Sequence, residues 1–158
     1  MRFPCSHVVI RPVSLAVIAA ALMPALALSA PSASLSSPVG KWKTIDDATG
    51  KAKSIVAIRE ENGKFYGTIE KIFDPPVPKP TCYLCSGAMK DRPLVGLQVL
   101  WGFKWDGSKW SGGQVLDPET GKIYRASLAL EDRGRKLRLH GYIGIPLFGR
   151  TQYWSRVE

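Results

Sequence analysis

Several residue types and motifs are scarce or missing in this chain, and each shortage excludes a class of protein. Three cysteines in 158 residues are too few for a small domain built on disulfides. Apolar residues nowhere keep a sustained 3.6-residue period, which excludes a coiled coil, and the mixed short-period pattern excludes a polytopic membrane protein. The Gly-x-Ser-x-Gly, His-Glu-x-x-His and phosphate-binding glycine motifs are also missing. We therefore predict no catalytic residues, no metal site and no cofactor.

The composition that is present fits one ordinary folded domain. Hydrophobic residues make up 45% of the chain, charged residues 22% and aromatic residues 9%, which excludes global disorder and supplies a hydrophobic core. The formal net charge is +9, but the cations are spread through every segment and no nucleic-acid-binding motif accompanies them. We predict no nucleic-acid partner. A solvated basic surface or an anionic amphipathic ligand explains the charge.

The first thirty residues have the plan of a secretory signal peptide. They contain no Asp or Glu, carry Arg2 and Arg11, and continue with an apolar run over 13–28. Small residues precede two cleavage points, so we expect a signal peptide over 1–30 that is cut after Ala27 or Ala30. Loss of the two arginines lowers the formal net charge to +7. The expected product is an exported protein, periplasmic or secreted.

A membrane anchor is the alternative interpretation of this segment. The apolar run is short for a span, Pro24 interrupts it, and the next cation is Lys41, so the basic flank of a stop-transfer segment is missing. We therefore expect no stable membrane span after processing. The sequence leaves the oligomeric state open.

From residue 40 onward the chain reads as short β segments separated by turns. Residues 31–39 are rich in Ser, Ala and Pro and predict a flexible linker. Turn signals such as Asn62-Gly63 and Asp106-Gly107 recur every 10 to 15 residues. Eight strands are expected over 40–46, 53–60, 64–73, 94–105, 109–116, 122–131, 135–143 and 151–157. Such a meander is most stable when it closes, so we predict an all-β domain over 40–158, an antiparallel up-and-down β-barrel of about eight strands.

Alternation within the strands predicts which side chains point inward. In 94–105 the residues Val95, Leu97, Val99, Trp101, Phe103 and Trp105 share one face. An eight-stranded barrel is wide enough either for packed side chains or for one small ligand, and the sequence does not decide between them. If the barrel is hollow, the predicted ligand-binding residues are Phe65, Ile69, Val99, Trp101, Tyr124, Leu128 and Leu139.

Several segments resemble DUF2147, a family of exported bacterial proteins. The resemblance rests on Gly40-Lys41-Trp42, Arg92-Pro93-Leu94-Val95-Gly96, Trp110-Ser111-Gly112-Gly113, Asp117-Pro118-Glu119-Thr120-Gly121-Lys122 and the run from Gly141-Tyr142-Ile143-Gly144 to Pro146-Leu147-Phe148-Gly149-Arg150-Thr151. It covers the whole domain and implies a lipocalin-like (calycin-like) barrel. It brings no catalytic residues.

The opening Gly40-x-Trp42 also resembles lipocalins and their relatives. In those proteins a Trp of the first strand packs beneath an Arg of the last strand and closes one barrel end. The resemblance implies that Trp42 and Arg156 form this structural pair, with Arg150 as the competing partner. An indole face attracts a guanidinium by about 0.5–2 kcal/mol.

Cys82 and Cys85 form a Cys-x-x-Cys motif in the proline-rich gap 74–93. A structural disulfide is the default interpretation in an oxidising compartment. A redox role needs a helix N-terminus after a strand, and a zinc site needs two further ligands. Redox, metal and free-thiol interpretations stay open as alternatives. The gap itself predicts a long loop at the barrel mouth.

Two functions follow from a domain of this kind. The first is a non-catalytic barrel that binds a small apolar or amphipathic molecule such as a fatty acid or lipid fragment. The alternative is an envelope interaction or structural protein whose barrel is filled by side chains and holds no ligand. An enzyme ranks third because motifs for catalysis are missing. The presence of an internal cavity distinguishes the first two.

Overall fold

The structure, a computed structural model, describes residues 36–157. The expected signal peptide and its two cleavage points lie outside the described residues, as does the linker as far as residue 35. No helix between residues 36 and 157 is long and apolar enough to cross a membrane.

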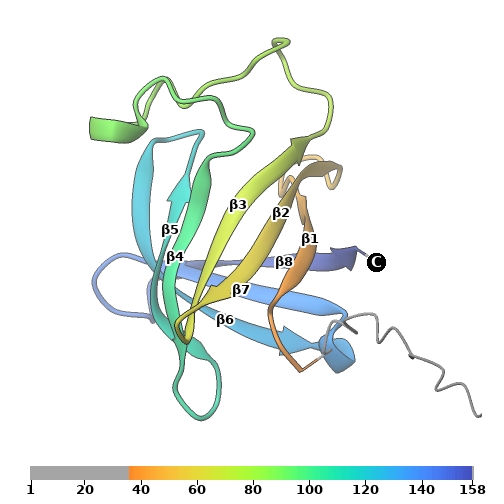
Figure 1. The fold of residues 1–158 in the computed structure, drawn as a ribbon, viewed down its shortest axis with the longest axis vertical. Helices are drawn as coiled ribbons and strands as arrows, with labels where there is room; N and C mark the ends of the chain where they lie inside the picture. The colour runs from red at the N-terminus through yellow and green to blue at the C-terminus, as the bar shows by residue number, and fades with distance from the viewer. Residues whose placement is uncertain (1–35, 158) are drawn as a thin grey trace, which may run out of the picture. The chain divides into compact units, whose positions relative to one another are not determined.

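The described chain forms a closed antiparallel barrel of eight strands (Figure 1). In chain order these are β1 (Gly40–Ile45), β2 (Ala52–Glu61), β3 (Lys64–Ile72), β4 (Gln98–Trp105), β5 (Trp110–Asp117), β6 (Lys122–Glu131), β7 (Lys136–Tyr142) and β8 (Gly149–Val157). Two short 3₁₀ turns, η1 (Gly87–Met89) and η2 (Asp132–Gly134), complete the described secondary structure. The predicted all-β up-and-down barrel is confirmed.

Every strand pairs with its sequence neighbours, and β1 also pairs with β8. The hairpins explain this order. At the β2–β3 turn Asn62 and Gly63 adopt φ of 52° and 72°, the left-handed backbone that a tight hairpin needs and that Asn and Gly tolerate. Closure then removes both sheet edges, which would otherwise expose unpaired backbone groups.

The alternation predicted for β4 is interrupted. Val99 and Phe103 are buried as predicted, but Leu100 between them is also fully buried, and Trp105 is 55% exposed. The register with β3 shifts along this strand, and Gly102 has a φ of 74°. Each of the two shifts inserts an extra residue in β4, so the alternation slips between Gln98 and Leu100 and returns to the predicted phase at Phe103. Val95, at 53% exposure, lies before β4 in the long connection.

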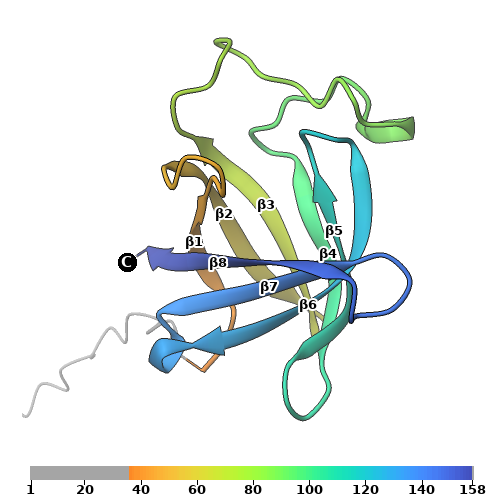
Figure 2. The ribbon, with the colours of Figure 1, turned by 180° about the vertical axis from the view of Figure 1, so that it is seen from behind.

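The two ends of the barrel differ. One end is packed by large side chains, among them the fully buried Trp42, Phe103 and Leu137. At this end the rings of Phe65 and Trp110 pack edge-to-face, with 5.9 Å between their centroids. The other end, the mouth, carries the connections over 46–51, 73–97, 118–121 and 143–148. Figure 2 shows the long β3–β4 connection extending past the strand ends there.

Candidate functional site

A cavity of about 960 Å³ extends from the barrel interior to the mouth, where residues of the 73–97 and 143–148 connections line it. Its deep walls are apolar and buried, and they include Val56, Ile69, Val99, Leu139 and Trp154. A volume of this size lies within the range of small-molecule sites, roughly 300–1,000 Å³. The barrel is therefore hollow toward the mouth and packed only at the opposite end.

Four of the seven residues predicted to bind a ligand line this cavity. They are Ile69, Val99, Tyr124 and Leu139. Phe65 and Leu128 point inward as expected but belong to the packed end, where Phe65 contacts Trp110 and Leu128 pairs with it across β5 and β6. Both side chains are buried below the cavity, and neither is part of its lining.

Trp101 lies elsewhere, and its expected inward position is corrected. Because of the register shifts along β4, Trp101 is half-buried on the outer side of the strand and borders a separate, smaller hollow. Of the five tryptophans, Trp154 on β8 is the one that lines the internal cavity.

Polar groups interrupt the apolar wall near the mouth. The hydroxyls of Thr44 and Ser54 hydrogen-bond at 2.8 Å in a buried position. Gln152 Nε2 donates to Asp47 Oδ2 at 3.0 Å, and Arg150 forms an ion pair with the same carboxylate. The hydrogen bond from Gln152 has the largest effect on the pKa of Asp47 and lowers it. Burial, the next largest, raises that pKa, and the hydrogen bond and charge of Arg150 lower it again, so the net shift is downward. This cluster ties the β1–β2 connection to β8 at the cavity mouth.

Sequence reasoning placed no residue of β8 at the cavity and considered Arg150 only as a partner for Trp42, although a signal was present. Alternation places Arg150, Gln152, Trp154 and Arg156 on one face of β8. Three of the four are polar, so the face does not look like a barrel interior. In the structure Arg150, Gln152 and Trp154 of this face line the cavity, and Arg156 lies at the packed end.

The packed end is closed by Arg156 and Trp42. The guanidinium carbon of Arg156 lies 4.3 Å from the Trp42 ring centroid. Its nitrogens donate to the carbonyls of Gly134, Val39 and Ser37 at 2.7–2.8 Å, and burial lowers the pKa of Arg156. Residues 36–39 of the expected linker are thus bound beneath the barrel. Arg150, the competing partner, lies at the mouth.

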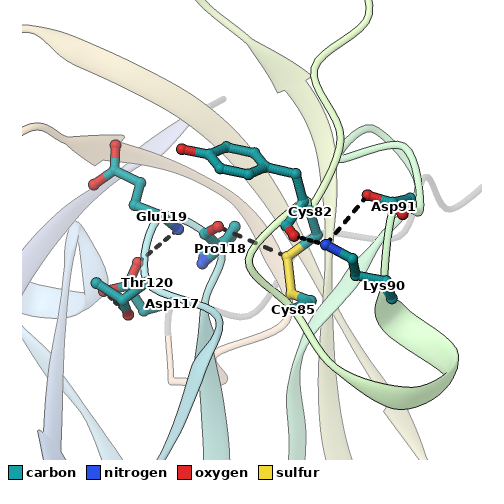
Figure 3. The surroundings of a disulfide bond; sticks show 9 residues. Cys82, Cys85, Lys90, Asp91, Asp117, Pro118, Glu119 and Thr120 are labelled. Carbon is teal, nitrogen blue, oxygen red and sulfur yellow. Dashed lines mark hydrogen bonds and ion pairs between the residues drawn. A yellow bond between two sulfur atoms is a disulfide. The ribbon is translucent and has the colours of Figure 1, made fainter.

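The long β3–β4 connection is itself compact and contains the Cys82–Cys85 disulfide. Cys82 N donates to Arg92 O at 2.9 Å, and Leu94 N donates to Pro80 O at 2.9 Å. The disulfide faces the β5–β6 turn, where Cys82 Sγ lies 3.7 Å from the carbonyl oxygen of Pro118 (Figure 3). At Gly121 any β-carbon would come within 2.0 Å of Leu84 O, so only glycine permits this contact.

Replacing both cysteines by serine should therefore leave the barrel folded. The chain-entropy model gives about 2 kcal/mol for so short a ring, as an upper figure, and the backbone hydrogen bonds of the connection remain. Thermal unfolding followed by circular dichroism measures the cost. Loss of the β signal at 25 °C in the double variant would contradict a supporting role for the disulfide.

Large apolar side chains surround the mouth. Ile143 and Phe148 line the cavity and are 66% and 73% exposed, and Leu147 between them is 80% exposed. His140 holds this connection in place, because its Nε2 lies 2.8 Å from Pro146 O and its Nδ1 lies 2.8 Å from Thr151 Oγ1. Since a carbonyl only accepts, Nε2 carries a proton and donates it. His140 is thus a structural residue on the outer side of β7.

Metal binding and acid–base chemistry would depend on the possible metal ligands and on the carboxylates near the mouth. Among residues 36–157 no three His, Cys, Asp or Glu side chains gather as metal ligands would. Asp46 caps its turn by accepting from Thr49 N and Oγ1, both at 2.8 Å, and these bonds lower its pKa. The apolar walls and the polar groups at the mouth have the chemistry to enclose a molecule with an apolar body and one polar end.

Comparisons with known proteins agree with this architecture. The chain is similar to the protein HP1028 of Helicobacter pylori, described as belonging to the lipocalin family, with 24% identity and a TM-score of 0.66 over 76% of this chain and 82% of that one. No curated protein sequence matches the chain. The family model described as "Uncharacterized protein conserved in bacteria (DUF2147)" matches residues 40–156. The chain therefore belongs to the DUF2147 family and folds as a lipocalin-like barrel.

Proposed function

We propose that this protein is an exported, non-catalytic barrel that binds a small apolar or amphipathic ligand, such as a fatty acid or lipid fragment, in its internal cavity. The observation that carries the proposal is the cavity of about 960 Å³ with deep apolar walls. A barrel that served only as a structural or interaction module would gain stability by filling this space with side chains.

The wall chemistry supports an elongated ligand with one polar end. The apolar end would lie against Ile69, Val99 and Leu139, away from the mouth. The polar end would lie near Gln152 and Arg150, which line the cavity and are both bound to Asp47. Cations and carboxylates alternate there, since Arg150 is paired with Asp47 and Lys53 with Glu119 at 2.6 Å. A neutral head group or a single carboxylate fits this mixed setting.

One further feature supports export and another supports ligand binding. The Cys82–Cys85 disulfide suits an oxidising compartment. The exposed apolar residues around the mouth, with Phe148 and Ile143 in both the rim and the lining, would give an apolar ligand a continuous path into the barrel. Large exposed apolar patches of this kind mark binding regions.

Contact quenching of tryptophan by a brominated fatty acid tests the proposal. Bromine carried at mid-chain quenches an indole only at short range. Trp154 lines the cavity, so titration should quench part of the fluorescence and saturate at one ligand per chain. In Trp154→Phe this quenched part should disappear, whereas in Trp101→Phe it should persist, because Trp101 lies outside the cavity.

Native mass spectrometry of protein taken from its own host envelope gives the second measurement. A co-purifying mass released by organic solvent would support the proposal and identify the ligand. Saturable quenching that survives in Trp154→Phe would place the fatty acid elsewhere. Absence of quenching together with a ligand-free mass would favour the alternative interaction role.

A further inference from the structure

We propose that a second site, on the outer face of the barrel, binds an acidic sugar ring through Trp101, Gln114 and Arg125. The site is a hollow of about 410 Å³ over β4, β5 and β6, bordered by β7. Its lining comprises Trp101, Gly102, Gly112, Gly113, Gln114, Arg125 and Tyr142. It is separate from the internal cavity except for Tyr142, which borders both.

The strand register places the large side chains of the hollow in one row. Trp101 pairs with Gln114, Gln114 with Arg125, and Arg125 with Tyr142. Directly paired residues of neighbouring strands point to the same face of a sheet. The buried neighbours of this row, such as Leu100 and Ala126, point inward, so the row itself faces outward.

The floor of the hollow is bare backbone. Gly102 and Gly112 lie on adjacent strands with φ of 74° and 72°, and a β-carbon at either position would meet nothing within 4 Å. Ladder pairing between β4 and β5 is interrupted here, since the strands pair at Trp101–Gln114 and again only at Lys104–Ser111. On their other edges β4 bulges against β3, and β5 bulges against β6. A bulge leaves backbone polar groups unpaired, and glycine in a strand marks a place where a ligand can approach closely.

Arg125 supplies an uncommitted positive charge at the edge of the hollow. Within residues 36–157 its guanidinium forms no ion pair, hydrogen bond or ring contact, in contrast to Arg59, which pairs with Glu61 at 2.7 Å. A guanidinium presents a planar fork that matches a carboxylate. The Gln114 side chain beside it is exposed and offers both a donor and an acceptor.

These groups together select the class of ligand. Trp101 and Arg125 stand two strands apart, about 10 Å, which leaves room for a sugar ring on the indole face with its carboxylate on the guanidinium. Gln114 between them and the unpaired backbone groups would bind the hydroxyls. An acidic peptide would satisfy Arg125 but would place no ring on Trp101, so the row favours the sugar.

Calorimetric titration of the full chain tests this site with two matched oligosaccharides. One is a hyaluronan hexasaccharide, which alternates glucuronate with N-acetylglucosamine, and the other is the neutral hexamer of N-acetylglucosamine. The acidic hexasaccharide should bind at least tenfold more tightly. Arg125→Gln should abolish that preference, and Gln114→Ala should weaken binding while the fold stays intact, because both side chains are exposed.

Arg133→Gln is the control, since it removes one exposed cation from the opposite end of the barrel and should retain the preference. Fatty-acid quenching of Trp154 should be unchanged in Arg125→Gln, which separates this site from the internal cavity. Equal binding of the two oligosaccharides, absence of binding, or a preference that survives in Arg125→Gln would overturn the proposal. Polyglutamate that binds as tightly as the acidic hexasaccharide would overturn it in favour of a peptide.

Discussion

Replacing Arg156 by leucine is expected to lower the free energy of unfolding by about 3 kcal/mol, a decrease of about 10 °C in Tm for a domain of this size. The substitution removes three donors and leaves the carbonyls of Ser37, Val39 and Gly134 without them. Each carbonyl left unsatisfied in a buried position costs about 1–3 kcal/mol. These hydrogen bonds are only partly buried, so water can replace some of the lost donors. The expected loss of about 3 kcal/mol is therefore near the lower limit of the sum over three carbonyls.

The attraction between Arg156 and the Trp42 ring, 4.3 Å apart, adds to this loss. The indole would remain buried, and its Nε1 would still donate to Pro38 O at 2.8 Å. Ser37 and Val39 would then lose their hydrogen bonds from Arg156, while Pro38 would keep the one from Trp42. We expect earlier proteolytic cleavage near this segment in Arg156→Leu than in the wild-type protein.

Arg150→Leu is the matched control, because it removes an arginine from the same strand. Arg150 and its partner Asp47 are largely solvent-exposed, and exposed ion pairs contribute about 0–1 kcal/mol. Chemical denaturation of the two variants side by side measures the difference. Equal destabilisation would show that Arg156 has no special part in closing the barrel.

Local sequence signals were sufficient to predict the barrel, because each hairpin is encoded by its own turn. Asn62-Gly63 adopts the left-handed backbone of a tight turn, and the alternation of Phe65, Gly67 and Ile69 matches their inward positions on β3. With short connections, neighbouring strands pair in sequence order and little choice of topology remains.

The candidate site was harder to predict because bulges shift the alternation. The register shifts along β4 turn Trp101 outward, whereas Phe103 keeps its predicted inward position. Glycine is compatible with both a regular strand and a bulge, so the sequence did not specify which one occurs. Whether the barrel is hollow was also beyond reach, since it depends on volumes summed across eight strands rather than on any local pattern.

The compact form of the 73–97 connection was missed for a related reason. Its prolines argued against a strand, but its hydrogen bonds join residues far apart within the segment, such as Pro80 and Leu94. Its packing depends on Gly121 in another turn. Contacts of this kind arise from the tertiary fold, and a single sequence gives no direct signal for them.

Val99→Arg is expected to weaken fatty-acid binding in the internal cavity by more than 100-fold. Val99 is buried and lines the cavity, so the arginine would extend into the space that the apolar chain is proposed to occupy. In the unliganded protein water can solvate the guanidinium within this large cavity, and the fold should survive. Binding would strip that water from an unpaired charge, which costs several kcal/mol, and 100-fold corresponds to about 2.8 kcal/mol.

Val99→Met separates charge from size, because methionine is long and flexible but apolar. It should keep binding within about tenfold of the wild-type affinity, as a partly filled cavity still offers apolar walls. Quenching of Trp154 by the brominated fatty acid reports both affinities, and denaturation curves show that each variant is folded. If Val99→Arg binds as well as Val99→Met, the fatty acid does not pass the β4 wall. The charged and polar groups of the mouth, Gln152 and Arg150 among them, would then be its whole site.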